Sequence, residues 1–214
     1  MGLSVNGENN RLTIVVEGRE RELTEEIPGL DIAVEGDDNC VRIEYPQTFE
    51  NSRLKITGNG NRFEAAASCR RIDGVFFCLC DGCRINIGRN CFFNRDIAVL
   101  AKEKKAVSVV FGNDVIVGTG TIIRCGDGHT VVDAGSRDPL NPPADIVIGS
   151  HVWIGARCMI LKGAVIGRNS IVGAMSLVNK SFAEPNLLVA GVPAAVIRRG
   201  VDWDMADYAS YTEI

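Results

Sequence analysis

Aliphatic residues recur at every sixth position across the C-terminal half of the chain, and this period constrains the fold most strongly. The repeat runs through Ile148, Ile154, Ile160, Ile166, Val172 and Val178. A second column, four places after each of the first five, is mostly small and holds Val152, Cys158, Ala164, Ser170 and Ser176. A period of six fits neither a helical turn nor the alternation of an isolated strand. Six residues can supply one short strand and one tight corner, so three units would form a triangular coil of about 18 residues.

A looser repeat of about 22 residues occupies the N-terminal half. One column holds Ile32, Leu54 and Phe76, a second holds Val34, Ile56, Cys78 and Leu100, and a third holds Val41, Phe63, Ile85 and Val107. Gly36 and Asn39 recur as Gly58 and Asn61, which indicates the same turn in successive copies. Each copy therefore predicts one coil with about four extra residues in a corner.

Stacked coils of this kind pair their strands in parallel and bury the aligned aliphatic residues. We therefore predict an all-β parallel β-helix, with N-terminal coils over 1–84, hexapeptide coils over 85–198 and a tail over 199–214. A β-sandwich of alternating strands is the rival fold, but it offers no reason for a period of six residues.

The six-residue period fails between Ile123 and Ile146, where the sequence is RCGDGHTVVDAGSRDPLNPPAD. Gly, Pro, Asp and Asn are frequent there, which predicts an inserted loop over 124–145. A loop of about twenty residues in a compact repeat is usually functional. It contains His129, one of only two histidines, whereas the other, His151, is expected at a corner. We therefore expect the functional site at this loop.

The charge balance narrows the class of partner. The chain holds 23 basic and 27 acidic residues, a net charge of -4, so binding to nucleic-acid phosphates is not expected. Residues 1–64 contain 7 basic and 13 acidic residues, whereas 65–214 contain 16 and 14, so an anionic ligand should prefer the second part. The sequence has no apolar run of about 18 residues, so no membrane span is expected, and the N-terminal residues show no secretory signal.

Eight cysteines accompany the two histidines. Cys78, Cys80 and Cys83 could suggest zinc, but zinc sites usually present two separated C-x-x-C pairs or cysteine with histidine. Cys78 shares the column of Val34 and Ile56, so core packing is the preferred interpretation and no metal is expected. Cysteines in a chain without a secretory signal indicate the reducing cytoplasm.

Motifs in the second half resemble those of a known family. GDGHTVVD, NPP, HVWIG, NKSFAEPN and AGVPAAVIR follow one another as they do in the hexapeptide-repeat acyltransferases. The resemblance covers about residues 85–204 and is nearest to enzymes that O-acetylate polysaccharides, including sialic-acid capsules. It implies a left-handed β-helix, acetyl-CoA as co-substrate, and a homotrimer with active sites between chains.

The resemblance also implies roles for individual residues. His129, in Asp127-Gly128-His129, falls on the family's catalytic histidine, and Trp153 falls on its tryptophan. Asp127 and Asn141 are expected to bind the acceptor, and Asn141 also to shape the loop. The expected coenzyme-binding residues are Trp153, Gly173, Ala174, Lys180, Pro193, Arg198 and Arg199.

These residue types suit acetyl transfer to a hydroxyl group. An imidazole changes its charge near neutrality and can take a proton as a hydroxyl oxygen attacks a thioester. An indole N–H can stabilise the oxyanion, and a basic, glycine-rich groove can hold phosphates. A nucleophile pair of Cys125 and His129 is an open alternative.

Other functions have to be distinguished from this one. Carbonic anhydrases share the fold, but their zinc needs three histidines and this chain has two. A non-catalytic β-helix that only binds a partner would need neither the D-x-H loop nor HVWIG. Within the acyltransferases, the acceptor could be a sugar hydroxyl, an amino-sugar nitrogen, an antibiotic or serine. The motifs favour a hydroxyl of a sugar or polysaccharide.

Overall fold

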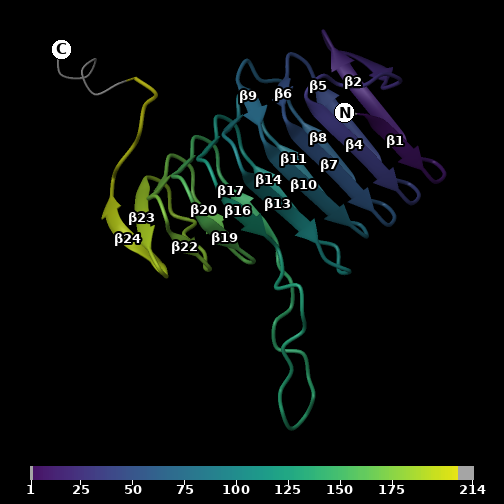
Figure 1. Cartoon of the computed structure of the whole chain (residues 1–214). Helices are drawn as coiled ribbons and strands as arrows, with labels where there is room; N and C mark the ends of the chain where they lie inside the picture. Colours follow the sequence, from purple (N-terminus) through teal and green to yellow (C-terminus); the bar gives the residue numbers. More distant parts are fainter. Residues whose placement is uncertain (1, 207–214) are drawn as a thin grey trace.

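The computed structural model describes residues 2–206, which wind as a triangular stack of coils (Figure 1). Three sheets of eight strands, here called A, B and C, form the sides of the stack. Between residues 30 and 178, successive strands enter A, then B, then C, and each pairs in parallel with the strand one coil away. The parallel β-helix expected from the repeats is confirmed, and so is the left-handed form that the family resemblance implies. Residues 207–214 of the predicted tail lie outside the described residues.

The three sheets differ in which part of each coil they collect. Sheet A contains β1 (Leu3–Asn6), β4 (Leu30–Glu35), β7 (Ser52–Thr57), β10 (Val75–Cys80), β13 (Ile97–Lys102), β16 (Ile122–Arg124), β19 (Met159–Leu161) and β22 (Leu177–Val178). Sheet B contains β2 (Arg11–Val16), β3 (Arg19–Glu22), β5 (Cys40–Glu44), β8 (Arg62–Ala65), β11 (Arg84–Ile87), β14 (Ser108–Phe111), β17 (Ile146–Ile148) and β20 (Val165–Ile166). Sheet C contains β6 (Thr48–Glu50), β9 (Arg71–Asp73), β12 (Phe92–Phe93), β15 (Ile116–Val117), β18 (Trp153–Ile154), β21 (Ile171–Val172), β23 (Leu187–Gly191) and β24 (Ala194–Arg199).

Antiparallel hairpins close the stack at both ends. At the first end β3 pairs with β2 in sheet B, and at the last end β24 pairs with β23 in sheet C. Because each hairpin covers a row of unpaired backbone groups, it limits edge-to-edge pairing with other chains. Residues 2–206 contain no helix, and so none with the length and apolar character that a membrane crossing requires.

The six-residue columns line the interior as predicted. The first column is at most 1% exposed at every position from Ile148 to Val178, and the second column, from Val152 to Ser176, is buried at the corners. Burying one such valine or isoleucine stabilises the fold by about 1.5–3 kcal/mol relative to an exposed side chain. Each six-residue unit therefore supplies one side and one corner of a triangular coil.

The 22-residue columns are correct only in part, because the corners vary in length. Ile32 pairs with Leu54 as predicted, but Leu54 pairs with Phe77 and not with Phe76. One additional residue in the corner between Ala65 and Ile72 shifts sheet A by one position. Phe77 is fully buried, whereas Phe76 faces outward and is 37% exposed.

The same shift corrects the placement of Cys78. It aligns with Lys55 and Leu100 on the outward face of sheet A, and Leu79 takes the core position beside Ile56. Cys78 is still buried, and this burial raises the pKa of its thiol. Val107 is also wrongly placed, because a longer corner brings Val109 into register with Ile85.

Buried asparagines fix the A–B corners of the first coils. Asn39 and Asn61 are each 1% exposed. The Asn61 side chain donates from Nδ2 to Asn39 Oδ1 at 3.0 Å, and its own Oδ1 accepts from the Cys83 backbone N–H at 3.1 Å. The recurrence of Asn39 as Asn61 therefore reflects a ladder that satisfies buried backbone and side-chain groups.

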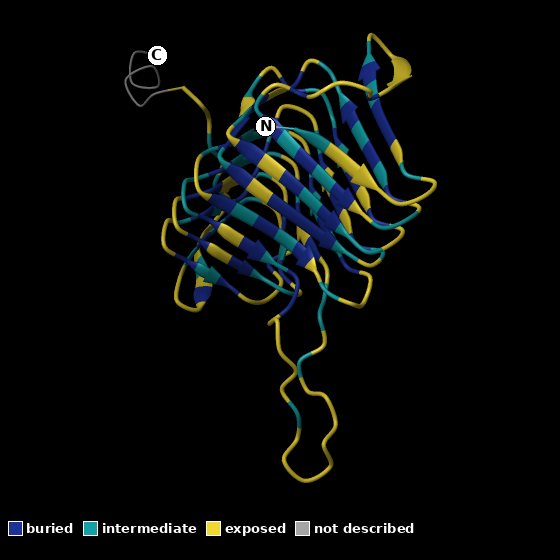
Figure 2. Ribbon diagram, turned by 45° about the vertical axis from the view of Figure 1, so that its right-hand side comes forward, coloured by how far each residue is buried: buried dark blue, intermediate teal, exposed yellow. Residues whose placement is uncertain are grey.

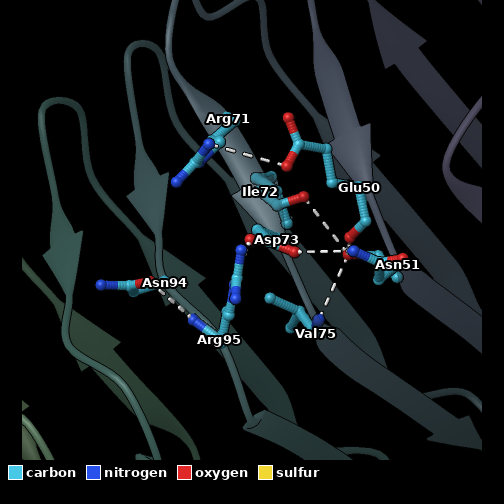
Figure 3. A network of polar contacts seen from close by, with 9 residues as sticks. Glu50, Asn51, Arg71, Ile72, Asp73, Val75, Asn94 and Arg95 are labelled. Atoms are coloured by element: carbon cyan, nitrogen blue, oxygen red, sulfur yellow. Dashed lines mark hydrogen bonds and ion pairs between the residues drawn. The ribbon is translucent and has the colours of Figure 1, made fainter.

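A buried carboxylate holds the C–A corner of the N-terminal coils (Figure 3). The Asp73 side chain is 1% exposed and accepts hydrogen bonds from Arg95 Nε at 2.9 Å and from Asn51 Nδ2 at 3.2 Å. The bond from Arg95 is the main reason that the pKa of Asp73 lies below its ordinary value. Asp73 therefore remains ionised at neutral pH although it is buried.

We expect Arg95→Leu to lower the thermal unfolding midpoint, because Asp73 would stay charged and buried after losing its cation. Combining Arg95→Leu with Asp73→Asn should recover part of the loss, since no buried charge remains. In the wild type the stabilisation is fully present above the ordinary pKa of Asp73 and disappears as the pH falls through the lowered folded-state pKa. Circular dichroism melts of the two variants test this, and an unchanged midpoint in Arg95→Leu would contradict it.

Candidate active site

The inserted loop leaves the stack at the corner between sheets A and B, where it connects β16 to β17. It projects far from the coils, and most of its residues are exposed (Figures 1 and 2). Near its tip Val132 bridges Pro139, and Asp133 Oδ1 accepts from the backbone N–H groups of Gly135 and Ser136 at 2.8 Å each. The loop is therefore an ordered arm with its own hydrogen bonds.

Two side chains, Asn141 and Lys162, brace the segment that carries His129. Asn141 Nδ2 donates to Asp127 Oδ2 at 2.7 Å and to the His129 carbonyl at 2.9 Å, while its Oδ1 accepts from the Val131 N–H at 2.7 Å. Lys162 Nζ, from the next coil, donates to Asp127 Oδ2 at 2.5 Å and to the Asn141 carbonyl at 3.1 Å. Hydrogen bonding from Lys162 is the main reason that the pKa of Asp127 lies below its ordinary value. The root of the arm is thus tied to the rigid stack.

His129 lines a cavity of about 270 Å³ at the root of the arm. Glu103, Asp127 and Asn141 also line it, together with the rigid Pro142-Pro143 pair. His129 is exposed, while its own backbone carbonyl is held by Asn141. An accessible imidazole on a fixed backbone, beside carboxylates that can accept hydrogen bonds from hydroxyl groups, suits the activation of a ligand hydroxyl.

Cys125 does not line this cavity. Its side chain is fully buried, with Sγ 3.5 Å from the Ser108 carbonyl oxygen. Burial raises the pKa of the Cys125 thiol to about 12, so very little nucleophilic thiolate exists at neutral pH. The geometry therefore argues against the Cys125–His129 nucleophile pair that the sequence left open.

Trp153 lies on sheet C, away from the arm. Its side chain is 44% exposed and stands in register between Ile116 and Ile171 on the outward face. The arm leaves from the A–B corner, which is opposite sheet C in a triangular coil. Within one chain, therefore, His129 and Trp153 are not brought together.

His151 occupies the B–C corner with a φ of 56° and anchors the C-terminal tail. Trp203 stacks on its ring with centroids 4.3 Å apart, and Trp203 Nε1 donates to the His151 carbonyl at 3.0 Å. Asp202 Oδ1 lies 3.2 Å from His151 Nε2. The two histidines thus lie at different corners, and the tail brings Trp203 to 6.3 Å from Trp153, measured between ring centroids.

The residues expected to bind the coenzyme are spread over more than one corner. Gly173 and Ala174 lie at the C–A corner, and the Gly191 N–H ties the hairpin turn that carries Pro193 to Ser176 Oγ there at 3.1 Å. Arg198 and Arg199 lie at the other end of β24, where Arg199 Nη1 is 3.4 Å from Glu184. Lys180 follows β22, with Nζ 5.4 Å from the centre of the Phe182 ring. Within one chain, therefore, the turn that carries Pro193 lies beside Gly173, whereas Lys180 lies at a different corner.

Sequence reasoning missed Lys162, Glu103 and Trp203 as parts of these sites. Arg124 pairs with Leu161, so Lys162 stacks directly beside the root of the arm. A column alignment extended across the inserted loop would have shown this neighbour. Glu103 and Trp203 lie in a corner and in the tail, where neither repeat has a fixed period.

Residues 145–180 match the family model described as bacterial transferase hexapeptide, six repeats. Residues 145–180 of this β-helix therefore carry hexapeptide repeats. The resemblance to hexapeptide-repeat acyltransferases is confirmed on the repeat, the coils and the relatives described next.

Two relatives and one solved structure show which proteins this β-helix is similar to. It is 34% identical over 127 residues to the galactoside O-acetyltransferase of Escherichia coli K12, a match that covers 59% of this chain and 60% of that protein. It is 28% identical to the polysialic acid O-acetyltransferase of Neisseria meningitidis over 84% of this chain and 81% of that protein. The crystal structure of the polySia-specific acetyltransferase NeuO superposes with a TM-score of 0.81 at 24% identity, covering 99% and 97% of the two chains. The chain thus matches less than two thirds of the galactoside enzyme but nearly the whole fold of NeuO.

Proposed function

We propose that this hexapeptide-repeat protein is an acetyl-CoA-dependent O-acetyltransferase that modifies a hydroxyl of a sugar or polysaccharide. The observation that carries the proposal is His129, exposed in a cavity at the root of an arm that Asp127, Asn141 and Lys162 hold to the stack. The relatives named as galactoside and polysialic acid O-acetyltransferases support the same reaction. The eight cysteines support a reducing cytoplasm as its location.

His129 is the general base in this mechanism. It accepts the proton of the acceptor hydroxyl as the oxygen attacks the thioester carbonyl and forms the new oxygen–carbon bond. The tetrahedral oxyanion then collapses, and the carbon–sulfur bond breaks. The same imidazole returns the proton to the departing thiolate. Asp127 lines the cavity and contacts the acceptor sugar, while Asn141 holds the His129 backbone in place. No acyl-enzyme is needed, in line with the buried, protonated Cys125.

The acceptor class follows from the relatives. A match of 28% over most of both chains links this protein to an enzyme named for polysialic acid, which is an acidic polysaccharide. We therefore propose a sialic-acid-containing polysaccharide before a neutral galactoside. Transfer to an amino-sugar nitrogen or to an antibiotic is the alternative acceptor chemistry.

Two outward rows of apolar side chains support a homotrimer. The sheet A row aligns Phe76, Ala98, Ile122, Met159 and Leu177 on consecutive strands. The sheet C row aligns Phe92, Ile116, Trp153, Ile171 and Leu188 in the same way. Partly exposed apolar rows of this length favour contact with a partner surface. In a closed ring each chain presents one surface to one neighbour and a different surface to the other, which two such rows provide.

The corner between sheets C and A sets the geometry of this trimer. Ala156 is a small, exposed residue at that corner, and it suits close packing around a threefold axis. Sheet A of one chain then faces sheet C of the next, with the arm of the first chain at the outer end of the groove. His129 therefore meets Trp153 of its neighbour, and the coenzyme lies against Gly173, Ala174, Lys180, Pro193, Arg198 and Arg199.

The proposed domains divide the work along the stack. Coils in 85–198 carry the transfer chemistry, and those in 1–84 extend the surface on the other side of the arm. Acetyl-CoA would supply the activated acetyl thioester, and the exposed basic residues of the last coils suit its phosphates.

Trp153→Phe separates a donor role from a packing role. The variant keeps a ring on sheet C but loses the indole N–H, so turnover should fall by about tenfold to a thousandfold if that group stabilises the oxyanion. Thermal stability should change little, because Trp153 is 44% exposed. Steady-state kinetics and a melting curve on the same sample test this, and an unchanged rate assigns Trp153 to packing.

The direct test of the proposed function is an acceptor screen with acetyl-CoA. Release of free thiol is measured with polysialic acid, sialic acid, galactosides, amino sugars and chloramphenicol. The proposal expects release with a hydroxyl-bearing sugar and an alkali-labile ester in the product. Coenzyme binding without thiol release from any acceptor would favour a non-catalytic binding module instead.

A further inference from the structure

A second, larger cavity adjoins the one that holds His129. It has a volume of about 740 Å³ and is lined by residues of the strands and corners on the N-terminal side of the arm. Glu103, Gly126, Gly128 and Thr130 line both cavities, so the two meet at the root of the arm. A ligand that reaches His129 can therefore extend into this second space.

The second cavity is a groove that runs across four coils. Thr57 belongs to β7, Asp81 follows β10, Leu100 belongs to β13 and Arg124 belongs to β16. Neighbouring strands lie about 4.8 Å apart, so three steps between coils give a length of about 14 Å. The groove thus continues well beyond the group that reacts at His129, toward the N-terminal coils.

The groove carries charges of both signs that form no ion pair with one another or with the rest of the described chain. Lys102, Lys104 and Arg124 are its cations, and Asp81 and Glu103 are its anions. In the part of the chain that the structure describes, none of the ion pairs within 4 Å involves any of these five residues. Their charges therefore remain available to a ligand.

Two glycines let these charges approach the root of the arm. Arg124 Nε donates to the Gly126 carbonyl at 2.6 Å, and a terminal nitrogen of its guanidinium lies 3.3 Å from where a Cβ on Gly128 would stand. Glu103 occupies the space that a Cβ on Gly126 would need. The guanidinium and the carboxylate are thereby placed next to the segment that carries His129.

This mixture of groups selects a ligand class. Lysine and arginine bind carboxylates, and arginine can do so through two parallel bonds. Carboxylates and threonine hydroxyls accept hydrogen bonds from sugar hydroxyls. An acidic oligosaccharide presents both carboxylates and hydroxyls along its length, whereas a neutral sugar leaves the cations unpaired.

We propose that this groove binds the sugar residues next to the one that is acetylated, in an acidic oligosaccharide whose carboxylates contact Lys102, Lys104 and Arg124. This inference rests on the proposed function, because the groove is continuous with the cavity that holds the proposed general base, His129. The coils on the N-terminal side of the arm thereby supply acceptor subsites, while the coils that follow the arm face the coenzyme. The protein is then a polymer-acting enzyme that prefers long acceptors to monomers.

The test compares Lys102→Ala/Lys104→Ala with Lys105→Ala. Lys105 is exposed and adjacent in sequence but does not line the groove, so it is a matched control for lost positive charge. With polysialic acid as acceptor, the double variant should raise KM by about three- to tenfold, since two partly exposed charge contacts are lost. Its kcat, its KM for acetyl-CoA and its kcat/KM for monomeric sialic acid should stay within about twofold of wild type.

Binding in the absence of turnover separates this inference from the proposed function. On a His129→Ala background, calorimetry with polysialic acid should show the same weakening for the double variant but not for Lys105→Ala. Added salt should weaken polymer binding more in the His129→Ala protein that keeps both lysines than in the one that also carries the double substitution. If the double variant and the control bind the polymer with equal affinity, the groove is not the polymer-binding site, even if acetyl transfer is intact. If only neutral galactosides are acetylated, the proposed acidic ligand is wrong, although the proposed O-acetyltransferase activity is correct.

Discussion

His129→Ala should lower turnover by about 10²–10⁴ while coenzyme binding survives, because the variant removes the base but not the surface that holds the donor. The fall should appear in kcat more than in KM, since His129 acts on the proton in the transition state. Thermal stability should be almost unchanged, because the side chain is exposed and Asn141 holds its backbone carbonyl and not its ring. Stopped assays of thiol release and coenzyme titration on the same preparation measure both quantities.

The other histidine provides the control for this variant. His151→Ala removes an imidazole from the B–C corner, where it stacks on Trp203 at 4.3 Å, and not from the cavity. Turnover in His151→Ala should therefore remain close to wild type, while the tail loses its anchor. If His129→Ala turned over at a near-normal rate, the base would have to be sought elsewhere, with Glu103 the first candidate in the cavity.

The fold could be predicted where the repeat is strict and only in part where the corners vary. From Ile148 to Val178 each side and corner uses six residues, so spacing alone places the buried residues. In the N-terminal coils the sides repeat but the corners gain or lose residues, and a fixed period of about 22 slips. One extra residue before Ile72 was enough to exchange Phe76 for Phe77 in the core column.

The position of the arm and of His129 on it was predictable, but the contacts that hold the arm were not. The break in the period located the arm and His129, because an insertion interrupts any strict repeat. Lys162 lies 35 residues from Asp127 and contacts it only because the coils stack. Contacts across coils depend on the register, and the register across the arm depends on how many residues loop out. Without that number, the sequence leaves the neighbours of the arm undetermined.

Trimers assembled from two kinds of inactive chain should regain activity. One chain carries His129→Ala and the other carries Arg198→Ala with Arg199→Ala, and the two are unfolded together in equal amounts and refolded. In the proposed assembly each site takes its base from one chain and part of its coenzyme surface from the next. Any mixed ring then holds one site in which both contributions are intact.

The expected recovery has a definite size. Random assembly makes about three quarters of the rings mixed, and one site in three is intact in each, so activity should return to about a quarter of wild type. Residual activity of the arginine variant is subtracted, and a tag on one chain confirms that mixed rings form. Each variant refolded alone, and the two mixed after refolding without unfolding, should stay inactive. Mixed rings with no recovered activity would place His129 and Arg198 in the same chain's site, and so would a fully active monomer on sedimentation. In either case the arm would have to fold back onto its own stack, although it leaves from the corner opposite sheet C.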